Sequence, residues 1–142
     1  MSNLILISVK EKYVAEMLTG RKTIELRKAK PKAYPGDTLI IYTTQPRKAI
    51  TAVALVKNII TCPPAEMWEK YNAKLGIDKA SFDNYYGGVN KAIGIEMTEI
   101  SALNAEILLS AIKTIQPNFT PPQTFKYLNK FATLRDFGHL LS

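Results

Sequence analysis

The sequence predicts an α+β domain in which about five strands form a small, closed or nearly closed β-barrel flanked by helices. Three observations predict this class. Short apolar runs recur along residues 1–100 and are bounded by turn residues. Segments with apolar residues three and four positions apart, the helical spacing, separate some of these runs. The chain has 142 residues, 46% of them hydrophobic and 22% charged, which suits a single globular domain over residues 1–142.

The first part of the chain predicts a strand, a helix and a second strand. Residues 4–8 form a short apolar run between polar neighbours, as in a buried strand. Apolar residues at helical spacing follow over residues 11–19, and Gly20 stands where such a helix would end. Residues 22–27 then alternate, with Ile24 and Leu26 on one face and polar residues on the other, which is the pattern of a strand.

Two further strands are expected after the turn formed by Pro35, Gly36 and Asp37. Residues 38–44 are apolar enough for a strand that is covered on both faces. Residues 49–61 form a long run rich in Val, Ile and Ala. Because only a short connection separates these two strands, we expect them to pair antiparallel and to help close the barrel.

The stretch from residue 63 to residue 88 predicts two helices. Pro63 and Pro64 end the long strand and open the first helix, which carries an apolar stripe. Asp78 is placed as the N-cap of the second, shorter helix, and a pair of glycines follows its expected end. These helices would pack on the barrel from outside.

The last part of the chain predicts one more strand and several helical segments. Residues 91–100 alternate in hydropathy and read as a strand. Residues 104–112 have helical spacing, and residues 125–131 suggest one or two further helical turns. Residues 134–141 carry apolar side chains at amphipathic spacing. No repeat and no long linker divides the chain, so we expect one domain.

Positive charge is concentrated in the first 60 residues. These hold eleven Lys and Arg against four Asp and Glu, a net charge of +7, which equals the net charge of the whole chain. A localised positive field favours polyanions and speeds their encounter. A basic surface that only aids solubility remains the alternative.

Several classes of site are disfavoured by what the chain contains. Cys62 is the only cysteine and His139 the only histidine, so neither an intrachain disulfide nor a Cys/His metal cluster is expected. We expect no metal and no cofactor. The apolar N-terminal run is too short to span a membrane and has no basic flank before it, so we expect a cytoplasmic protein without a membrane partner.

The stretch most informative about function is residues 20–27, Gly-Arg-Lys-Thr-Ile-Glu-Leu-Arg. The expected helix end leads directly into a strand with two cations and a carboxylate. Glu25 and Arg27 share one face, because strand side chains repeat every two residues, and Lys22 stands at the entrance. Such a set can hold a carboxylate between cations and present basic donors to an anion. An exposed strand with a weak surface ion pair is the alternative.

This octapeptide matches the G-x-K-x-x-E-x-R signature of the ASCH (activating signal cointegrator homology) domain, and the chain resembles that family. Its surroundings agree, because an apolar strand ending in Ser8 precedes the motif and a Pro-Gly-Asp turn follows it. Residues 121–128, Pro-Pro-Gln-Thr-Phe-Lys-Tyr-Leu, are similar to the P-P-Q-S-F-R-Y-L ending of a bacterial and phage branch of the family.

The resemblance implies a PUA-like barrel with a cleft lined by the signature residues. The family is generally proposed to bind RNA or nucleotides, and we take as the leading function a non-catalytic binder of RNA or a nucleotide-like ligand. Arg21, Lys22 and Arg27 would meet phosphate or carbonyl groups, and Glu25 would hold Arg27 or accept a hydrogen bond from a base. The other candidate ligand-binding residues are polar or aromatic: Ser8, Tyr42, Thr43, Tyr86 and Gln123.

Three other interpretations stay open. Some small relatives resemble amidohydrolases of acetylated cytidine, with Lys at the Lys22 position and Thr where this chain has Glu25. If the chain is such a hydrolase of modified nucleosides, Lys22 and Glu25 are its candidate catalytic residues. Ribonuclease activity has been assigned to other members of the superfamily. The apolar residues 134–141 could instead serve contacts with a protein partner.

Overall fold

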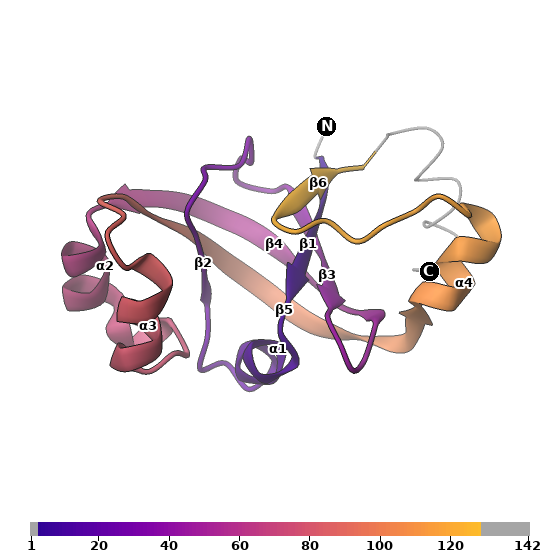
Figure 1. Cartoon of the computed structure of the whole chain (residues 1–142), viewed down its shortest axis with the longest axis horizontal. Coiled ribbons are helices and arrows are strands. Elements are labelled where there is room, and N and C mark those ends of the chain that lie inside the picture. The colour runs from indigo at the N-terminus through magenta and orange to yellow at the C-terminus, as the bar shows by residue number, and fades with distance from the viewer. Residues whose placement is uncertain (1–2, 129–142) are drawn as a thin grey trace.

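Six strands and four α-helices make up the part of the chain that the computed structural model describes, residues 3–128 (Figure 1). A short 3-10 helix, η1 (Asn72–Lys74), lies between the second and third helices. In chain order the other elements are β1 (Leu4–Val9), α1 (Glu11–Leu18), β2 (Ile24–Arg27), β3 (Thr38–Thr43), β4 (Ala49–Cys62), α2 (Pro64–Tyr71), α3 (Lys79–Tyr86), β5 (Ala92–Leu108), α4 (Leu109–Ile115) and β6 (Phe125–Tyr127).

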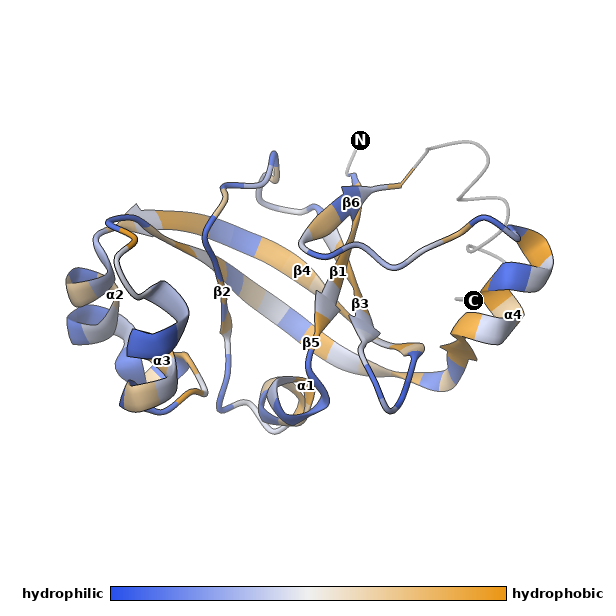
Figure 2. Cartoon of the chain, in the orientation of Figure 1, coloured by the Kyte–Doolittle hydropathy of each residue, from blue (hydrophilic) through white to orange (hydrophobic). Residues whose placement is uncertain are grey.

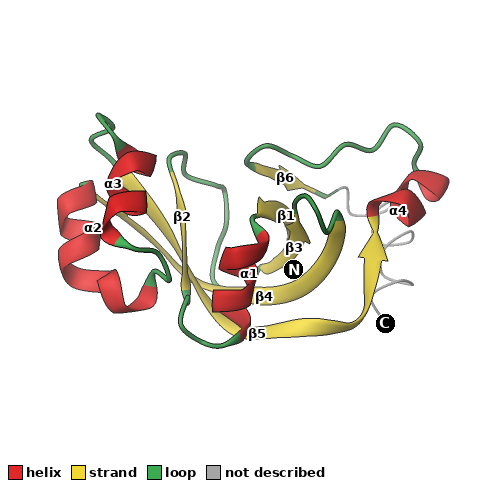
Figure 3. Cartoon of the chain, turned by 60° about the horizontal axis from the view of Figure 1, so that its bottom comes forward, coloured by secondary structure: helices red, strands yellow, loops and turns green. Residues whose placement is uncertain are grey.

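The strands form one sheet in the order β2-β5-β4-β3-β1-β6, which confirms the α+β class and the five predicted strands. β3 and β4 pair antiparallel, as predicted. β1 and β3 run parallel, because α1 and β2 intervene between them in the chain. The order leaves β2 and β6 as the two edges, so the sheet is a curled half-barrel with an open seam (Figure 3).

The curl of the sheet comes from its two longest strands. The pairing of β4 with β5 shifts register at three places along its length. Each β-bulge bends the strand and increases its local twist, so repeated bulges curl a long strand pair. Figure 3 shows β4 and β5 wrapping beneath β1 and β3.

Apolar side chains cover both faces of β1 and β3. The inner cluster contains Ile5 and Leu39, whereas their neighbours Leu6 and Ile40 belong to a second cluster that includes Ile112 of α4. This explains why the centre of this strand, residues 39–42, is apolar at every position, as expected for a strand covered on both faces. The apolar bands are visible along β1, β4 and β5 in Figure 2.

A third apolar cluster joins β2 to the helices α2 and α3. It contains Ile24 from β2, Met67 from α2, and Phe82 and Tyr86 from α3. The side chain of Asp78 accepts a hydrogen bond of 2.7 Å from the backbone N–H of Ser81, which confirms Asp78 as the N-cap of α3. These contacts fix β2 and α3 relative to each other, and both contribute to the pocket described below.

The structure corrects two predictions near the end of the chain. Residues 104–112 were expected to be helical, but β5 continues to Leu108 and α4 begins only at Leu109, because β4 pairs with this stretch as far as Ala49↔Leu108. The helical turn expected from Phe125 is instead strand β6, which pairs antiparallel with β1. Residues 129–142, including the apolar segment 134–141 and His139, lie outside the described residues. No helix among the described residues is long and apolar enough to cross a membrane.

Candidate nucleic-acid interface

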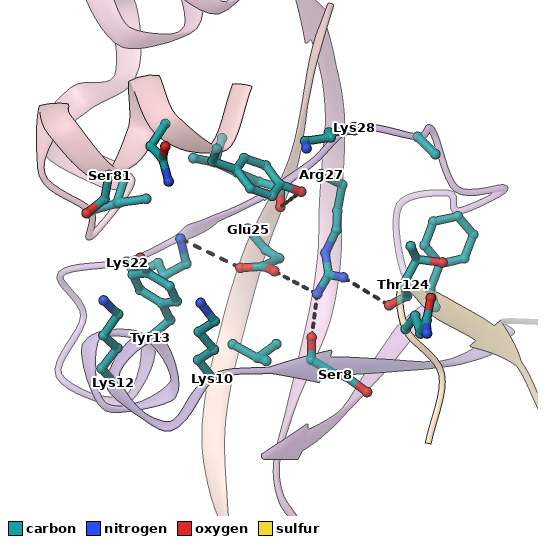
Figure 4. A pocket seen from close by; sticks show the side chains of 18 residues that line it. Ser8, Lys10, Lys12, Tyr13, Lys22, Glu25, Arg27, Lys28, Ser81 and Thr124 are labelled. Atoms are coloured by element: carbon teal, nitrogen blue, oxygen red, sulfur yellow. Dashed lines mark hydrogen bonds and ion pairs between the residues drawn. The ribbon is translucent and has the colours of Figure 1, made fainter. Parts of the chain in front are cut away.

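A pocket of about 700 Å³ opens at the seam of the half-barrel, where β2 faces β1 and the segment before β6 (Figure 4). Helices α1 and α3 border it on two further sides. Its floor is formed by buried residues of β2, and its rim by exposed residues of the surrounding loops and helices. The polar and aromatic side chains that line it are Ser8, Lys10, Lys12, Tyr13, Lys22, Glu25, Arg27, Lys28, Ser81, Asn84, Tyr85, Gln123, Thr124 and Phe125.

Arg27 bridges the seam. One terminal nitrogen, Nη2, donates a hydrogen bond to the carbonyl of Ser8 in β1 at 2.8 Å, and Nη1 donates to the carbonyl of Thr124, just before β6, at 3.0 Å. Nη2 also lies 2.7 Å from Oε2 of Glu25. The planar guanidinium offers several donors in a fixed fork, so one side chain can tie β2 to two segments of the opposite edge.

Glu25 stands between two cations on the pocket floor. Its Oε2 pairs with Arg27, and its Oε1 lies 3.6 Å from Nζ of Lys22. All three residues are buried, at 2% exposure for Lys22 and 7% for each of the other two. Two cations and one carboxylate leave the floor with a formal excess of one positive charge. A buried charge is costly unless it is compensated, so this floor is suited to an anion.

The position of Lys22 depends on a close backbone contact. Its Nζ donates a hydrogen bond of 2.6 Å to the carbonyl of Leu75, and the two residues form an isolated β-bridge. The neighbouring Gly76 has a φ of 58°, and a Cβ at that position would lie 2.6 Å from Cβ of Lys22. Burial lowers the pKa of Lys22 from the usual lysine value, while the nearby carboxylate of Glu25 acts in the opposite direction.

The pocket is strongly basic. Five cations line it, namely Lys10, Lys12, Lys22, Arg27 and Lys28, against the single carboxylate of Glu25. Three of them, Lys10, Lys12 and Lys28, are exposed and stand on its rim. The rim therefore adds three solvent-facing positive charges to the buried excess on the floor.

Two tyrosines contribute aromatic surface to the pocket. Nζ of Lys22 lies 5.1 Å from the ring centre of Tyr13, and Nζ of Lys28 lies 4.7 Å from that of Tyr85. Both rings are partly exposed, and they belong to two different helices that border the pocket, α1 and α3. Aromatic faces beside cations suit a ligand that combines a base with a phosphate.

The structure brings together five of the residues that the sequence singled out. Ser8, Lys22, Glu25, Arg27 and Gln123 all line the pocket. The hydroxyl of Ser8 donates to the carbonyl of Pro122 at 2.6 Å, so it fixes the segment that carries Gln123. Ser8 therefore acts on the pocket through the backbone as well as through its own surface.

Arg21 lies outside this pocket. Its exposed guanidinium pairs with Glu16 at 2.7 Å and borders a neighbouring hollow of about 590 Å³, which shares Lys12, Tyr13 and Ile77 with the main pocket. The other two predicted cations, Lys22 and Arg27, line the main pocket without Arg21.

Three predicted candidates are buried away from the pocket. Tyr42 belongs to the apolar cluster beneath α4, and the hydroxyl of Thr43 lies 2.7 Å from that of Thr51. The hydroxyl of Tyr86 donates to the backbone carbonyl of Arg27 at 2.9 Å, and burial raises its pKa. None of the three lines the pocket, so we omit them from the proposed binding surface.

Sequence reasoning missed Tyr13, Tyr85 and the rim lysines. Helical spacing does not separate Tyr85 from Tyr86, because they follow the buried Phe82 by three and four residues and both neighbour it on α3. The structure buries Tyr86 and leaves Tyr85 half-buried at the pocket. Lys10 and Lys12 flank the start of α1, and only the fold brings that start beside β2.

Comparison with known proteins gives a consistent result. Residues 7–113 match the family model described as the ASCH domain. A protein of Zymomonas mobilis named ASCH domain-containing ribonuclease is 26% identical over 127 residues, which cover 89% of this chain and 85% of that protein.

Solved structures agree at the level of fold. The crystal structure of ASCH from Zymomonas mobilis superposes with a TM-score of 0.91 at 25% identity, covering 99% of this chain and 96% of the other. Human THYN1, solved in complex with 5-methylcytosine-containing DNA, has a TM-score of 0.59 at 11% identity over 99% of this chain and 96% of its own. At that identity the second likeness concerns the fold alone, and it fits a PUA-like half-barrel.

Proposed function

The chain belongs to the ASCH domain family. From this premise we propose that the pocket at the barrel seam binds a single-stranded segment of RNA or a nucleotide-like fragment. The observation that carries this proposal is the charge of the pocket floor. Lys22, Glu25 and Arg27 are all buried and sum to one positive charge, which a phosphate would compensate.

A second feature of Arg27 supports an anionic or carbonyl-bearing ligand. Its Nε is buried and has no hydrogen-bond partner within the described part of the chain. Buried donors are nearly always paired, so a lone one calls for an explanation, such as a bound ion or water. A phosphate or base oxygen that reached Nε would remove this deficit.

Two observations favour RNA over other anions, namely the aromatic surface of the pocket and the similarity of this chain to a protein named a ribonuclease. The rings of Tyr13 and Tyr85 can stack on bases, while the rim lysines meet the backbone phosphates. The Zymomonas mobilis relative is named a ribonuclease, and this name supports RNA as the ligand class of the proposal.

The proposal can be tested by fluorescence anisotropy with a labelled single-stranded RNA. We expect log affinity to fall linearly with log salt, by about 0.7 per phosphate neutralised. Combined substitution Lys12→Ala and Lys28→Ala should reduce this slope by about 1.4, because both lysines are exposed rim residues. The matched control, Lys91→Ala with Lys113→Ala, removes two exposed lysines that do not line the pocket and should leave the slope unchanged. Absence of binding at low salt would refute the proposal.

RNA cleavage is the second candidate function, and Lys22 is the observation that favours it. A lysine whose pKa is lowered by burial can exchange a proton nearer neutral pH than usual, and Glu25 stands beside it. If the pocket cleaves RNA, Lys22→Met should abolish cleavage while binding is partly kept, and the wild-type rate should rise with pH. If the pocket binds RNA without cleaving it, the RNA stays intact with both the wild-type chain and Lys22→Met.

A further inference from the structure

The pocket continues, beyond the proposed nucleotide site, into an exposed surface formed by the loop between β2 and β3 and by strand β6. Residues 28–34 of this loop read Lys-Ala-Lys-Pro-Lys-Ala-Tyr. Lys28 lines the pocket rim, and Phe125 at the start of β6 lines it too. The loop and β6 therefore leave the pocket on the same side.

The second half of the loop displays its side chains in a fixed alternation. Pro31 and Ala33 are buried, whereas Lys30, Lys32 and Tyr34 are exposed. Buried and exposed side chains thus alternate along this part of the loop, and burial of Pro31 and Ala33 leaves the other three facing solvent. Tyr34 is 63% exposed, an unusual degree for a large aromatic side chain held by ordered backbone.

Several contacts anchor this arrangement. The backbone N–H of Lys32 donates to the hydroxyl of Tyr127 in β6, which ties the loop to that strand. The backbone N–H of Tyr34 donates to the buried carboxylate of Asp37 at 2.9 Å. The surface is thus built before any ligand arrives, and ordering it on binding costs little entropy.

The surface alternates positive and aromatic groups. Tyr127 is 44% exposed, and its ring packs edge-to-face on that of Phe125 with centres 5.9 Å apart. Lys30 and Lys32 are exposed beside Tyr34 in sequence, and residues 28–36 and 125–127 contain no acidic residue. Such interleaving suits single-stranded nucleic acid, in which bases stack while phosphates meet cations.

We infer that Lys30, Lys32, Tyr34 and Tyr127 form a stacking platform for the part of a single-stranded RNA that leaves the pocket, so that the preferred ligand is an oligonucleotide and not a single nucleotide. This inference rests on the proposed function of the pocket. It adds a second binding surface, and with it a dependence of affinity on RNA length.

The test compares RNA lengths on one protein. A dinucleotide should engage only the pocket, whereas an oligouridylate of about eight nucleotides should reach the platform as well. We expect the longer RNA to bind the wild-type chain at least tenfold more tightly. Tyr34→Ala should weaken binding of the longer RNA about fivefold or more, and should leave the affinity for the dinucleotide unchanged.

Salt dependence separates the phosphate contacts from stacking. Lys30→Ala with Lys32→Ala should lower the salt slope of the longer RNA by about 1.4 and leave that of the dinucleotide unchanged. The exposed pair Lys91→Ala with Lys113→Ala is the charge-matched control and should change neither. All the substituted side chains are exposed, so the fold is kept, and circular dichroism checks this.

The outcomes distinguish the two levels of the proposal. If both RNAs bind with equal affinity and the platform variants behave like wild type, the inferred stacking platform does not bind RNA, whereas the pocket proposal stands. If neither RNA binds, the pocket proposal fails and the platform with it. A gain of the same size with a single-stranded DNA of equal length would overturn the assignment to RNA while keeping the stacking surface.

Discussion

Replacing Arg27 should cost the protein far more stability than replacing an exposed arginine with the same kind of partner. Arg27 and Arg21 each place a terminal nitrogen 2.7 Å from a glutamate oxygen. The side chains of Arg27 and Glu25 are each 9% exposed, whereas those of Arg21 and Glu16 are 67% and 31% exposed. The two pairs match in charge and distance, and they differ in burial and in the two backbone carbonyls that Arg27 also binds.

The size of the effect follows from what Arg27→Ala leaves behind. Removing one member of a buried ion pair costs up to about 3–5 kcal/mol when the other charge loses its partner, and here Glu25 keeps only the more distant Lys22, at 3.6 Å. The carbonyls of Ser8 and Thr124 also lose their donors, and water reaching the seam replaces part of those bonds. We expect a total of about 3–5 kcal/mol for Arg27→Ala and about 0–1 kcal/mol for Arg21→Ala.

Urea unfolding followed by circular dichroism measures both variants. At a slope of about 1.5 kcal/mol per molar urea, Arg27→Ala should lower the midpoint by about 2–3 M. Arg27→Lys keeps the charge but cannot bridge the two segments in the same way. Its urea midpoint should therefore lie between those of Arg27→Ala and Arg21→Ala. Equal midpoints for Arg27→Ala and Arg21→Ala would refute the idea that Arg27 clasps the seam.

Three further predictions concern residues around this clasp. Gly76→Ala should destabilise more than Gly88→Ala in urea titrations, because both glycines have a positive φ, 58° and 81°, but only a Cβ at Gly76 would meet other atoms within 4 Å. The free energy of unfolding should rise with pH between the lowered pKa of Lys22 and the ordinary lysine pKa of about 10.4. In this range the unfolded chain binds more protons than the folded chain, so Lys22→Met should lack the rise. Tyr86→Phe should cost about 0.5–1.5 kcal/mol in the same titrations, because it removes the hydroxyl that donates to the carbonyl of Arg27.

The strands could be predicted because short apolar runs between turns report local burial. The continuation of β5 to Leu108 could not be read from the same signal. Residues 104–108 have helical spacing, but their pairing with the first part of β4 overrides it. A 14-residue β4 needs a partner of similar length, and the expected strand over residues 91–100 was too short to supply one. This difference in length between the two predicted strands was the sign in the sequence that β5 continues beyond residue 100.

The candidate site was predictable to the extent that it lies in one local motif. Glu25 and Arg27 alternate with apolar residues along β2 and lie together as the spacing indicates. Lys22 precedes the strand, and its contact with Glu25 depends on its bridge to Leu75. The bonds that Arg27 makes to Ser8 and Thr124 depend on where two sheet edges meet, which no local pattern encodes. Tyr42 and Thr43 were chosen for their polarity, but β3 is covered on both faces and buries them.

RNA binding at the seam pocket is tested most directly by an NMR titration of the isotope-labelled chain with a short single-stranded RNA at low salt. We expect saturable shifts of the backbone amides that surround the pocket, in residues 8–13, 22–29 and 123–125. Amides of α4, which does not border the pocket, should stay in place. Shifts confined to α4, or no shifts at any RNA concentration, would contradict the assignment of the seam pocket as an RNA-binding site.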